Sequence, residues 1–138
     1  MKTVLRFLLI LVSVLIVVGL LGPRPSKPKL NNDLPAAPSD LNLLESQVLG
    51  HEKSEKVKPD NEARFIWASD SAKGKTEYAM LYLHGFSACW YEGYPVNVDF
   101  ARYFGCNAYF PRLASHGVDT AEALIDMTPD RLWESAKE

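Results

Sequence analysis

The chain has 138 residues and a net charge of −2, and its basic and acidic side chains are mixed along its length. It contains neither a basic stripe nor an alternation of basic and aromatic residues, so we expect no nucleic-acid partner. Fourteen of its 15 aromatic residues lie at or after Phe65, and six of its nine prolines lie between Pro23 and Pro59. A globular part is therefore confined to about 75 residues, a size that is marginally stable alone.

The run from Phe7 to Gly22 is uncharged and follows two basic residues. Its 16 residues are more than the usual apolar core of a signal peptide and fewer than a full membrane span. It ends in bulky leucines instead of a small-residue cleavage site, and apolar residues just before it lengthen it. We predict that residues 1–22 are a signal anchor that enters the lipid bilayer through residues 7–22. A cleaved secretory signal is the alternative.

Basic residues lie on both sides of this run and nearly balance each other. Lys2 and Arg6 precede it, and Arg24, Lys27 and Lys29 follow it. The positive-inside rule therefore gives no strong preference, and the default is an amino end inside the cytoplasm. We predict a single-pass membrane protein whose C-terminal part lies outside the cytoplasm.

Residues 23–62 are predicted to be a linker outside the cytoplasm. Residues 23–40 are rich in Pro, Asn and Ser and indicate an extended spacer. Ser39 and Asp40 form a cap signal for a short helix near residues 41–49. Residues 51–62 are charged and predicted to be solvated, and we assign no chemistry to the lone histidine at their start, His51.

Residues 63–138 carry the alternating pattern of an α/β domain. The segment 78–83 is apolar throughout, which is typical of a strand covered on both faces in a parallel sheet. Gly105 is predicted to end a helix, and Thr128 to cap another that begins at Pro129. Alternation of strands and helices predicts a sheet that is at least partly parallel. The predicted elements are strands at 63–69, 78–83 and 107–110, helices at 97–104, 119–126 and 129–138, a turn at 70–76 and a loop at 111–117.

The two cysteines, Cys89 and Cys106, match no zinc-binding spacing and form no C-x-x-C motif. We predict that both are buried free thiols. A disulfide between them is the alternative if the domain lies in an oxidising compartment.

The stretch G-F-S-A-C at residues 85–89 misses the nucleophile motif G-x-S-x-G by one residue. A nucleophile elbow also needs a helix that begins directly after the serine. Here residues 90–95 (WYEGYP) place glycine and proline where the first helical turns would be. We therefore do not predict Ser87 as a nucleophile, although a Ser87 served by His116 stays open as an alternative.

Several segments of residues 63–138 together resemble the α/β-hydrolase superfamily. They are L-Y-L-H-G-F-S-A, the helix after it, the strand N-A-Y-F-P-R-L and the turn S-H-G-V-D. The resemblance is to esterases, lipases and lysophospholipase-like serine hydrolases, including those called serine aminopeptidase-like. The family pattern R-L-x-G-H-G is matched at residues 112–117, with Ser115 where glycine is usual.

The resemblance implies roles for the loop that begins at His84. In the family, the loop after the third strand gives a backbone N–H to the oxyanion hole, and one such donor contributes about 3 kcal/mol to transition-state stabilisation. By this resemblance Phe86 supplies that N–H, His84 and Gly85 shape the loop, and Ser87 lies close by. We expect His84 and His116 to fix loops by hydrogen bonds. The implied serine mechanism uses neither a metal nor an organic cofactor.

The family's catalytic triad has no counterpart in the chain. The triad order is serine, then aspartate or glutamate, then histidine, and no G-x-S-x-G occurs in the sequence. We therefore expect residues 63–138 to be an incomplete α/β-hydrolase domain that is inactive alone, with the triad beyond residue 138. The strand at 78–83, central in the family, would then expose an unpaired apolar edge.

The sequence thus favours the N-terminal portion of a membrane-anchored serine hydrolase that acts on ester or lipid substrates. Two other functions stay open. One is a membrane-anchored interaction module, or a remnant, without catalysis. The other is an enzyme in which Ser87 is the nucleophile and His116 its base.

Overall fold

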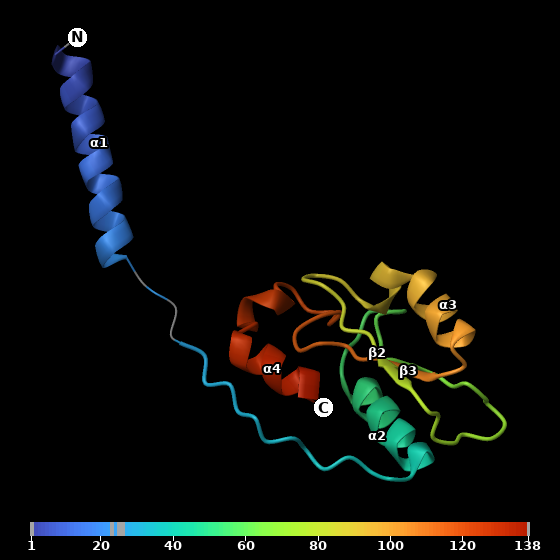
Figure 1. The fold of residues 1–138 in the computed structure, drawn as a ribbon. Helices are drawn as coiled ribbons and strands as arrows, with labels where there is room; N and C mark the ends of the chain where they lie inside the picture. Colours follow the sequence, from blue (N-terminus) through green and yellow to red (C-terminus); the bar gives the residue numbers. More distant parts are fainter. Residues whose placement is uncertain (1, 23, 25–26, 138) are drawn as a thin grey trace.

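The computed structural model of the protein describes residues 2–22, 24 and 27–137. Parts of three predicted segments lie outside the described residues: residue 1 of the anchor, residues 23, 25 and 26 of the spacer, and residue 138 of the last helix. The described chain is a mixed α/β structure with one N-terminal apolar helix, an extended connection and a domain around a three-stranded sheet (Figure 1).

The N-terminal helix α1 spans Lys2–Leu21. An 18-residue window of this 20-residue helix has a mean hydropathy of 3.0, and none of the helix residues is buried. A helix of this length rises about 30 Å, which matches the hydrocarbon core of a bilayer. The helix is therefore long and apolar enough to cross a membrane or to act as a signal sequence.

Helix α2 spans Leu41–Ser54 and begins where the cap signal predicted. The Asp40 carboxylate accepts hydrogen bonds from the backbone N–H groups of Asn42 and Leu43, at 2.8 and 3.4 Å. These bonds satisfy donors that the first helical turn leaves without partners.

The helix does not end near residue 49, however, but passes through Gly50 to Ser54. The prediction that residues 51–62 are solvated is also wrong at Glu52, whose side chain is 7% exposed. Its carboxylate accepts hydrogen bonds from the Ala63 amide, at 3.0 Å, and from the Arg112 guanidinium. The last turn of α2 is thus held by the domain, and this contact outweighs the low helix propensity of glycine.

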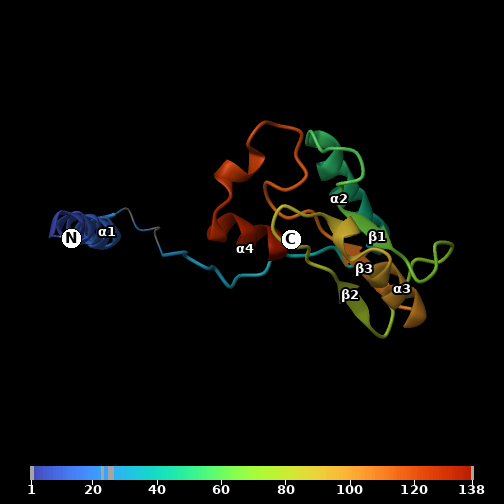
Figure 2. The ribbon, with the colours of Figure 1, turned by 90° about the horizontal axis from the view of Figure 1, so that it is seen from above.

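The sheet contains β1 (Arg64–Ile66), β2 (Ala79–Leu81) and β3 (Asn107–Phe110), in the order β1-β3-β2. β3 pairs antiparallel with β1 and parallel with β2, so the prediction of a partly parallel sheet is confirmed. Figure 2 shows β1 next to α2 and β2 at the opposite edge. The first strand is shorter than predicted because the Asn107 side chain, not the partner backbone, accepts the hydrogen bond of the Ala68 amide.

The prediction that residues 78–83 are covered on both faces is wrong. Only Met80 and Tyr82 pack against the core, whereas Leu81 and Leu83 are 54% and 47% exposed. β2 is an edge strand with one neighbour, and α2 lies near β1 rather than over β2. An exposed apolar edge of this kind is a template for another strand.

Helix α3 spans Val96–Tyr103, and Gly105 ends it as predicted. Gly105 has φ +58°, a conformation that residues with a Cβ rarely adopt. The Cys106 amide bonds to the Ala101 carbonyl at 3.0 Å, and the Gly105 amide bonds to the Arg102 carbonyl at 3.1 Å. This pair of bonds is a Schellman motif, and the buried side chains of Ala101 and Cys106 complete its apolar contact.

The core lies between α3 and the sheet. Its fully buried members are Val98 and Ala101 of α3, Cys106, and Ala108 and Phe110 of β3. Alternation along β3 sends Ala108 and Phe110 toward α3 and leaves Tyr109 on the other face, where its ring stacks on Phe65 at 4.6 Å. α2 contacts that second face through Glu45, which accepts a hydrogen bond from Trp67 at 2.9 Å.

The remaining helical elements follow β3. η2, a 3-10 helix, spans Ala123–Asp126, so the helix predicted at 119–126 forms only in its second half, after Glu122 at φ +57°. Helix α4 spans Pro129–Lys137, and the Thr128 hydroxyl accepts the Arg131 amide at 3.2 Å, as its cap signal predicted. η1, a second 3-10 helix, spans Trp90–Gly93 and precedes α3.

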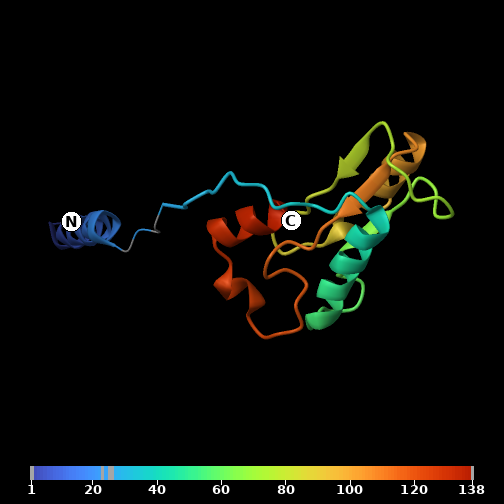
Figure 3. The ribbon, with the colours of Figure 1, turned by 90° about the horizontal axis from the view of Figure 1, so that it is seen from below.

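The spacer before α2 is extended, but it is not free of the domain. It runs past α4 on its way to α2 (Figure 3). The Lys29 amide donates to the Asp130 carboxylate at 2.6 Å, and the Lys137 ammonium donates to the carbonyls of Asn31 and Asp33. Residues 29–33 are therefore held against α4.

Both cysteines carry free thiols as predicted, but the prediction that both are buried is wrong for Cys89. Cys106 is buried in the core, and Cys89 is half-buried before η1.

Candidate functional site

The predicted loop from His84 to Ser87 follows the end of β2 and lies against the loop at residues 112–117. His84 is 5% exposed. Its Nε2 accepts a hydrogen bond from the Leu113 amide at 3.2 Å, and its Nδ1 lies 3.0 Å from the Gly85 carbonyl oxygen. The imidazole therefore joins the loops that follow the two parallel strands, in the role predicted for it.

These contacts fix the protonation state of His84. The Leu113 amide can only donate, so Nε2 must carry a lone pair, and the ring proton then lies on Nδ1 and donates to Gly85. Burial lowers the pKa of His84, and the nearby His116 acts in the same direction, while the bond to the Gly85 carbonyl opposes them. A proton on Nε2 would break the bond between the loops.

The lowered pKa of His84 predicts a pH dependence of stability. The unfolded chain binds a proton to this ring more readily than the folded chain does, so the free energy of unfolding should fall as the pH drops below about 6.5. Above this pH the contribution should be constant. His84→Gln offers an amide oxygen to Leu113 but cannot be protonated, so this variant should lack the part of the pH dependence that His84 causes.

The comparison is made by urea unfolding of both proteins between about pH 5 and pH 8. The two proteins differ only at position 84, and the other two histidines are present in both chains. If the free energy of unfolding of the wild type falls with decreasing pH no more steeply than that of the variant, the fold does not hold His84 neutral.

Residues 85–88 form a tight turn closed by a hydrogen bond from the Ala88 amide to the Gly85 carbonyl, at 3.2 Å. Ser87, at the third position, has φ +58°, the sign that a type II turn requires there. Phe86 is 72% exposed. Among the described residues, neither its backbone N–H nor that of Ser87 has an acceptor. Two consecutive backbone N–H groups in the turn after β2 therefore have no hydrogen-bond acceptor among the described residues.

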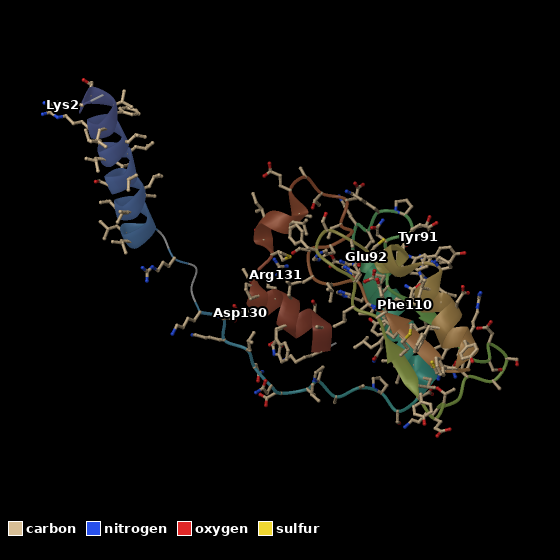
Figure 4. All side chains as sticks on the ribbon, turned by 45° about the horizontal axis from the view of Figure 1, so that its top comes forward. Lys2, Tyr91, Glu92, Phe110, Asp130 and Arg131 are labelled. Atoms are coloured by element: carbon tan, nitrogen blue, oxygen red, sulfur yellow. The ribbon has the colours of Figure 1, made fainter. Side chains whose placement is uncertain are left out.

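The neighbouring amide of Gly85 is occupied by Glu92 of η1 (Figure 4). The Glu92 carboxylate accepts the Gly85 N–H at 2.7 Å and the Tyr82 hydroxyl at 3.3 Å. A Cβ on Gly85 would lie 2.9 Å from this carboxylate, so any larger residue would require the end of the Glu92 side chain to shift. Burial, and then the Glu92 charge, raise the pKa of Tyr82. Glu92 therefore fixes the peptide that precedes Phe86.

His116 is brought next to the same loop. Its ring makes an edge contact with His84 at 4.9 Å and with Phe86 at 6.3 Å between ring centroids. It is 2% exposed, and its Nδ1 lies 2.9 Å from the Ala114 carbonyl oxygen. Its Nε2 is buried and has no hydrogen-bond partner among the described residues. His116 thus holds its own loop through Nδ1, whereas its Nε2 has no hydrogen-bond partner among the described residues.

Ser87 and His116 line one cleft of about 300 Å³, together with residues of the connections before β1 and after β3. Ser115 and Gly117, on either side of His116, have φ values of +66° and +64°. No hydrogen bond joins Ser87 to His116 in the described part of the chain. The two residues therefore share a space without forming a nucleophile–base pair.

The loop that carries His116 is held by a buried ion pair. The Arg112 guanidinium binds the Glu52 carboxylate through Nε at 2.9 Å and through a terminal nitrogen at 3.0 Å, and both side chains are at least nine-tenths buried. A third nitrogen donates to the His116 carbonyl at 3.2 Å. Arg112 thereby links α2 to the loop beside His84.

A larger cavity of about 600 Å³ lies between α2, the spacer and α4. His51, to which no chemistry was assigned, lines it, as do Glu52 and Arg112. None of the four residues from His84 to Ser87 does. This cavity is therefore separate from the turn at residues 84–87, although residues of the loop at 112–117 line it.

Sequence reasoning found the histidines and the turn but missed the two carboxylates that position them. Glu92 lies in a segment recognised only as unsuitable for a nucleophile elbow, and nothing in its spacing indicates a contact with Gly85. Glu52 lies in a charged stretch predicted to be solvated. Its partner Arg112 is the first residue of the segment that matches R-L-x-G-H-G. An arginine next to the site was the one signal in the sequence that a carboxylate lies nearby.

In the described part of the chain, no group of three His, Cys, Asp or Glu side chains is arranged to hold a metal ion. No family model matches the chain, and no curated protein or solved structure does so either.

Proposed function

We propose that residues 63–137 provide the oxyanion-hole side of the active site in a membrane-anchored serine hydrolase of the α/β-hydrolase type. Its substrates are carboxylic esters, including lipid esters. The observation that carries the proposal is the Phe86 N–H, which lies at the carboxyl end of a parallel strand without a protein acceptor. An N–H held in this way can receive the negative charge that develops on an acyl oxygen.

The sheet supports this proposal through its open edge. β2 pairs with β3 on one side only and leaves Leu81 and Leu83 half exposed. A further parallel strand beside β2 would pair with this open backbone edge and would end next to Phe86, because parallel strands end at the same edge. The nucleophile, its acid and its base then come from chain that follows residue 138.

A second candidate function makes Ser87 the nucleophile and His116 its base. It is favoured by their shared cleft, by the positive φ of Ser87 and by the free Nε2 of His116. It is opposed by the helix position, since α3 does not begin until Val96 and a nucleophile elbow needs a helix at once.

The proposal includes the membrane. In it, α1 is an uncleaved anchor, and the domain lies outside the cytoplasm. Its support is the 20-residue length of the helix and the run of apolar residues without a small-residue cleavage site.

The decisive experiment locates the reactive serine. The gene is sequenced beyond codon 138, and the protein it encodes is expressed with any residues that follow. This protein is treated with a biotinylated fluorophosphonate, digested, and analysed by mass spectrometry. We expect the phosphonyl group on the serine of a G-x-S-x-G motif beyond residue 138, with labelling unchanged in Ser87→Ala. An adduct on Ser87 establishes the second candidate instead. A stop codon directly after codon 138, with no adduct, overturns both and leaves a non-catalytic interaction module.

A further inference from the structure

Helix α3 is apolar on two sides. One side packs on the sheet through Val98 and Ala101. The other side, which we call the α3 outer face, is formed by Val96, Phe100, Tyr103 and Phe104. Their exposed fractions are 72%, 50%, 84% and 55%. A helix on the surface of a soluble domain normally has a polar outer side, so this arrangement needs an explanation.

The exposed side chains form a continuous cluster rather than scattered contacts. The rings of Phe100 and Phe104 lie 4.6 Å apart, and those of Tyr103 and Phe104 lie 5.0 Å apart. Just before α3, Tyr91 and Tyr94 form a second exposed pair, stacked at 5.1 Å. Contiguous apolar surface of this kind marks a site of interaction with a protein or a membrane.

Completion of the sheet does not cover the α3 outer face. Strands added at the β2 edge extend the sheet in its own plane, whereas α3 already forms the layer above the sheet (Figure 1). The outer side of a helix layer faces away from the core in a domain of three layers. The partner of this face is therefore something other than the next strand.

The chain itself keeps the domain close to a bilayer. The Lys29 amide is bound to Asp130 of α4, so only residues 22–28 separate α1 from a segment held by the domain. Seven residues span about 25 Å at most. With α1 in the membrane, the domain is thus confined to the bilayer surface at a high effective concentration.

The chemistry of the face also fits a bilayer surface. Phenylalanine and tyrosine rings are favoured at the membrane–water interface, where apolar rings enter the acyl boundary and hydroxyl groups stay hydrated. The charged side chains of α3 are one acid, Asp99, and one base, Arg102, so the helix has no net attraction to anionic lipid. Binding should come from buried apolar area.

We propose that the α3 outer face is a membrane-docking surface that lies in the headgroup region of the same bilayer that α1 enters. The partner is a zwitterionic phospholipid surface, and docking holds the domain in one orientation on it. This inference does not rest on hydrolase activity.

The test uses the full chain reconstituted in phosphatidylcholine vesicles. A photoreactive phenylalanine analogue replaces Tyr103. In a matched control it replaces Leu43, which is 49% exposed and belongs to α2, the helix on the opposite side of the sheet from α3. After irradiation, mass spectrometry identifies what is attached. We expect phospholipid adducts at position 103 that exceed those at position 43 at least tenfold and that persist in about 1 M salt, where charge attraction is screened.

Three results would overturn the proposal. Equal lipid adducts at both positions would mean that α1 alone brings lipid near the domain. A cross-linked second copy of the chain at position 103 would identify the face as a dimer contact. Adducts that disappear at high salt would mean that charge, not apolar contact, holds the domain to the surface.

Discussion

Replacement of Glu52 with alanine is expected to lower the free energy of unfolding by about 3–5 kcal/mol, because it leaves the Arg112 charge buried without a partner. Both side chains are at least nine-tenths buried, and the carboxylate also accepts the Ala63 amide. Domains of about 100 residues are only marginally stable, so a loss of this size is a large part of the total. Glu52→Ala should therefore unfold residues 40–137 under conditions in which the wild-type chain is folded.

Urea unfolding of the full chain in detergent micelles, followed by tryptophan fluorescence, measures this effect. Glu62→Ala is the matched control, because Glu62 is 42% exposed and lies 3.9 Å from Arg64, and its loss should change stability by less than about 1 kcal/mol. Glu52→Leu combined with Arg112→Met should regain most of the lost stability. Equal effects of Glu52→Ala and Glu62→Ala would show that the buried pair does not hold the fold.

The Glu52–Arg112 pair also connects stability to the site. Arg112 bonds to the His116 carbonyl, and the next residue, Leu113, donates its amide to His84. Loss of the pair should therefore release the loop that faces the turn of residues 85–88. Helix α2 lies in the segment that the sequence predicted to be a linker. Through this contact it packs on the domain and helps to position the loop.

Local signals in the sequence predicted those parts of the fold that are determined by local chemistry. The cap residues Asp40 and Thr128 start their helices, and Gly105 ends α3 because its left-handed conformation closes a Schellman motif. The limits of β3 agree with the structure at 107–110, since its apolar residues lie between a helix-ending glycine and a proline. Each of these features depends on neighbours within a few residues.

The parts that sequence reasoning missed depend on contacts between distant residues. Glu52 and Arg112 are 60 positions apart, and no periodicity connects them. The short β2 follows from its place at the sheet edge, which apolar composition alone does not reveal. Within the site, His84 and His116 were recognised as loop-fixing residues. The contact between their rings, and the bond from Gly85 to Glu92, required the folded chain.

If the proposed hydrolase function holds, Phe86→Pro is expected to lower kcat about 100- to 1,000-fold, because it removes the N–H proposed to bind the oxyanion. Proline is suited to this position. Phe86 is the second residue of the turn closed by Gly85 and Ala88, and proline is favoured there. No other described residue uses the Phe86 amide, so the substitution removes a donor that the fold does not need.

Phe86→Ala is the matched control. It removes the aromatic ring, which is 72% exposed, but keeps the N–H. This variant should bind an ester substrate less well and retain most of kcat, since the ring contributes surface rather than charge stabilisation. The two variants together separate the amide from the side chain.

The most direct test is the ratio of kcat for Phe86→Ala to kcat for Phe86→Pro, measured on a short-chain nitrophenyl ester with the product of the gene read through codon 138. A ratio of about 100 or more is expected if the backbone of residue 86 stabilises the oxyanion. A ratio near one, with both variants folded, would contradict the account, because the turn at residues 85–88 would then have no part in the reaction.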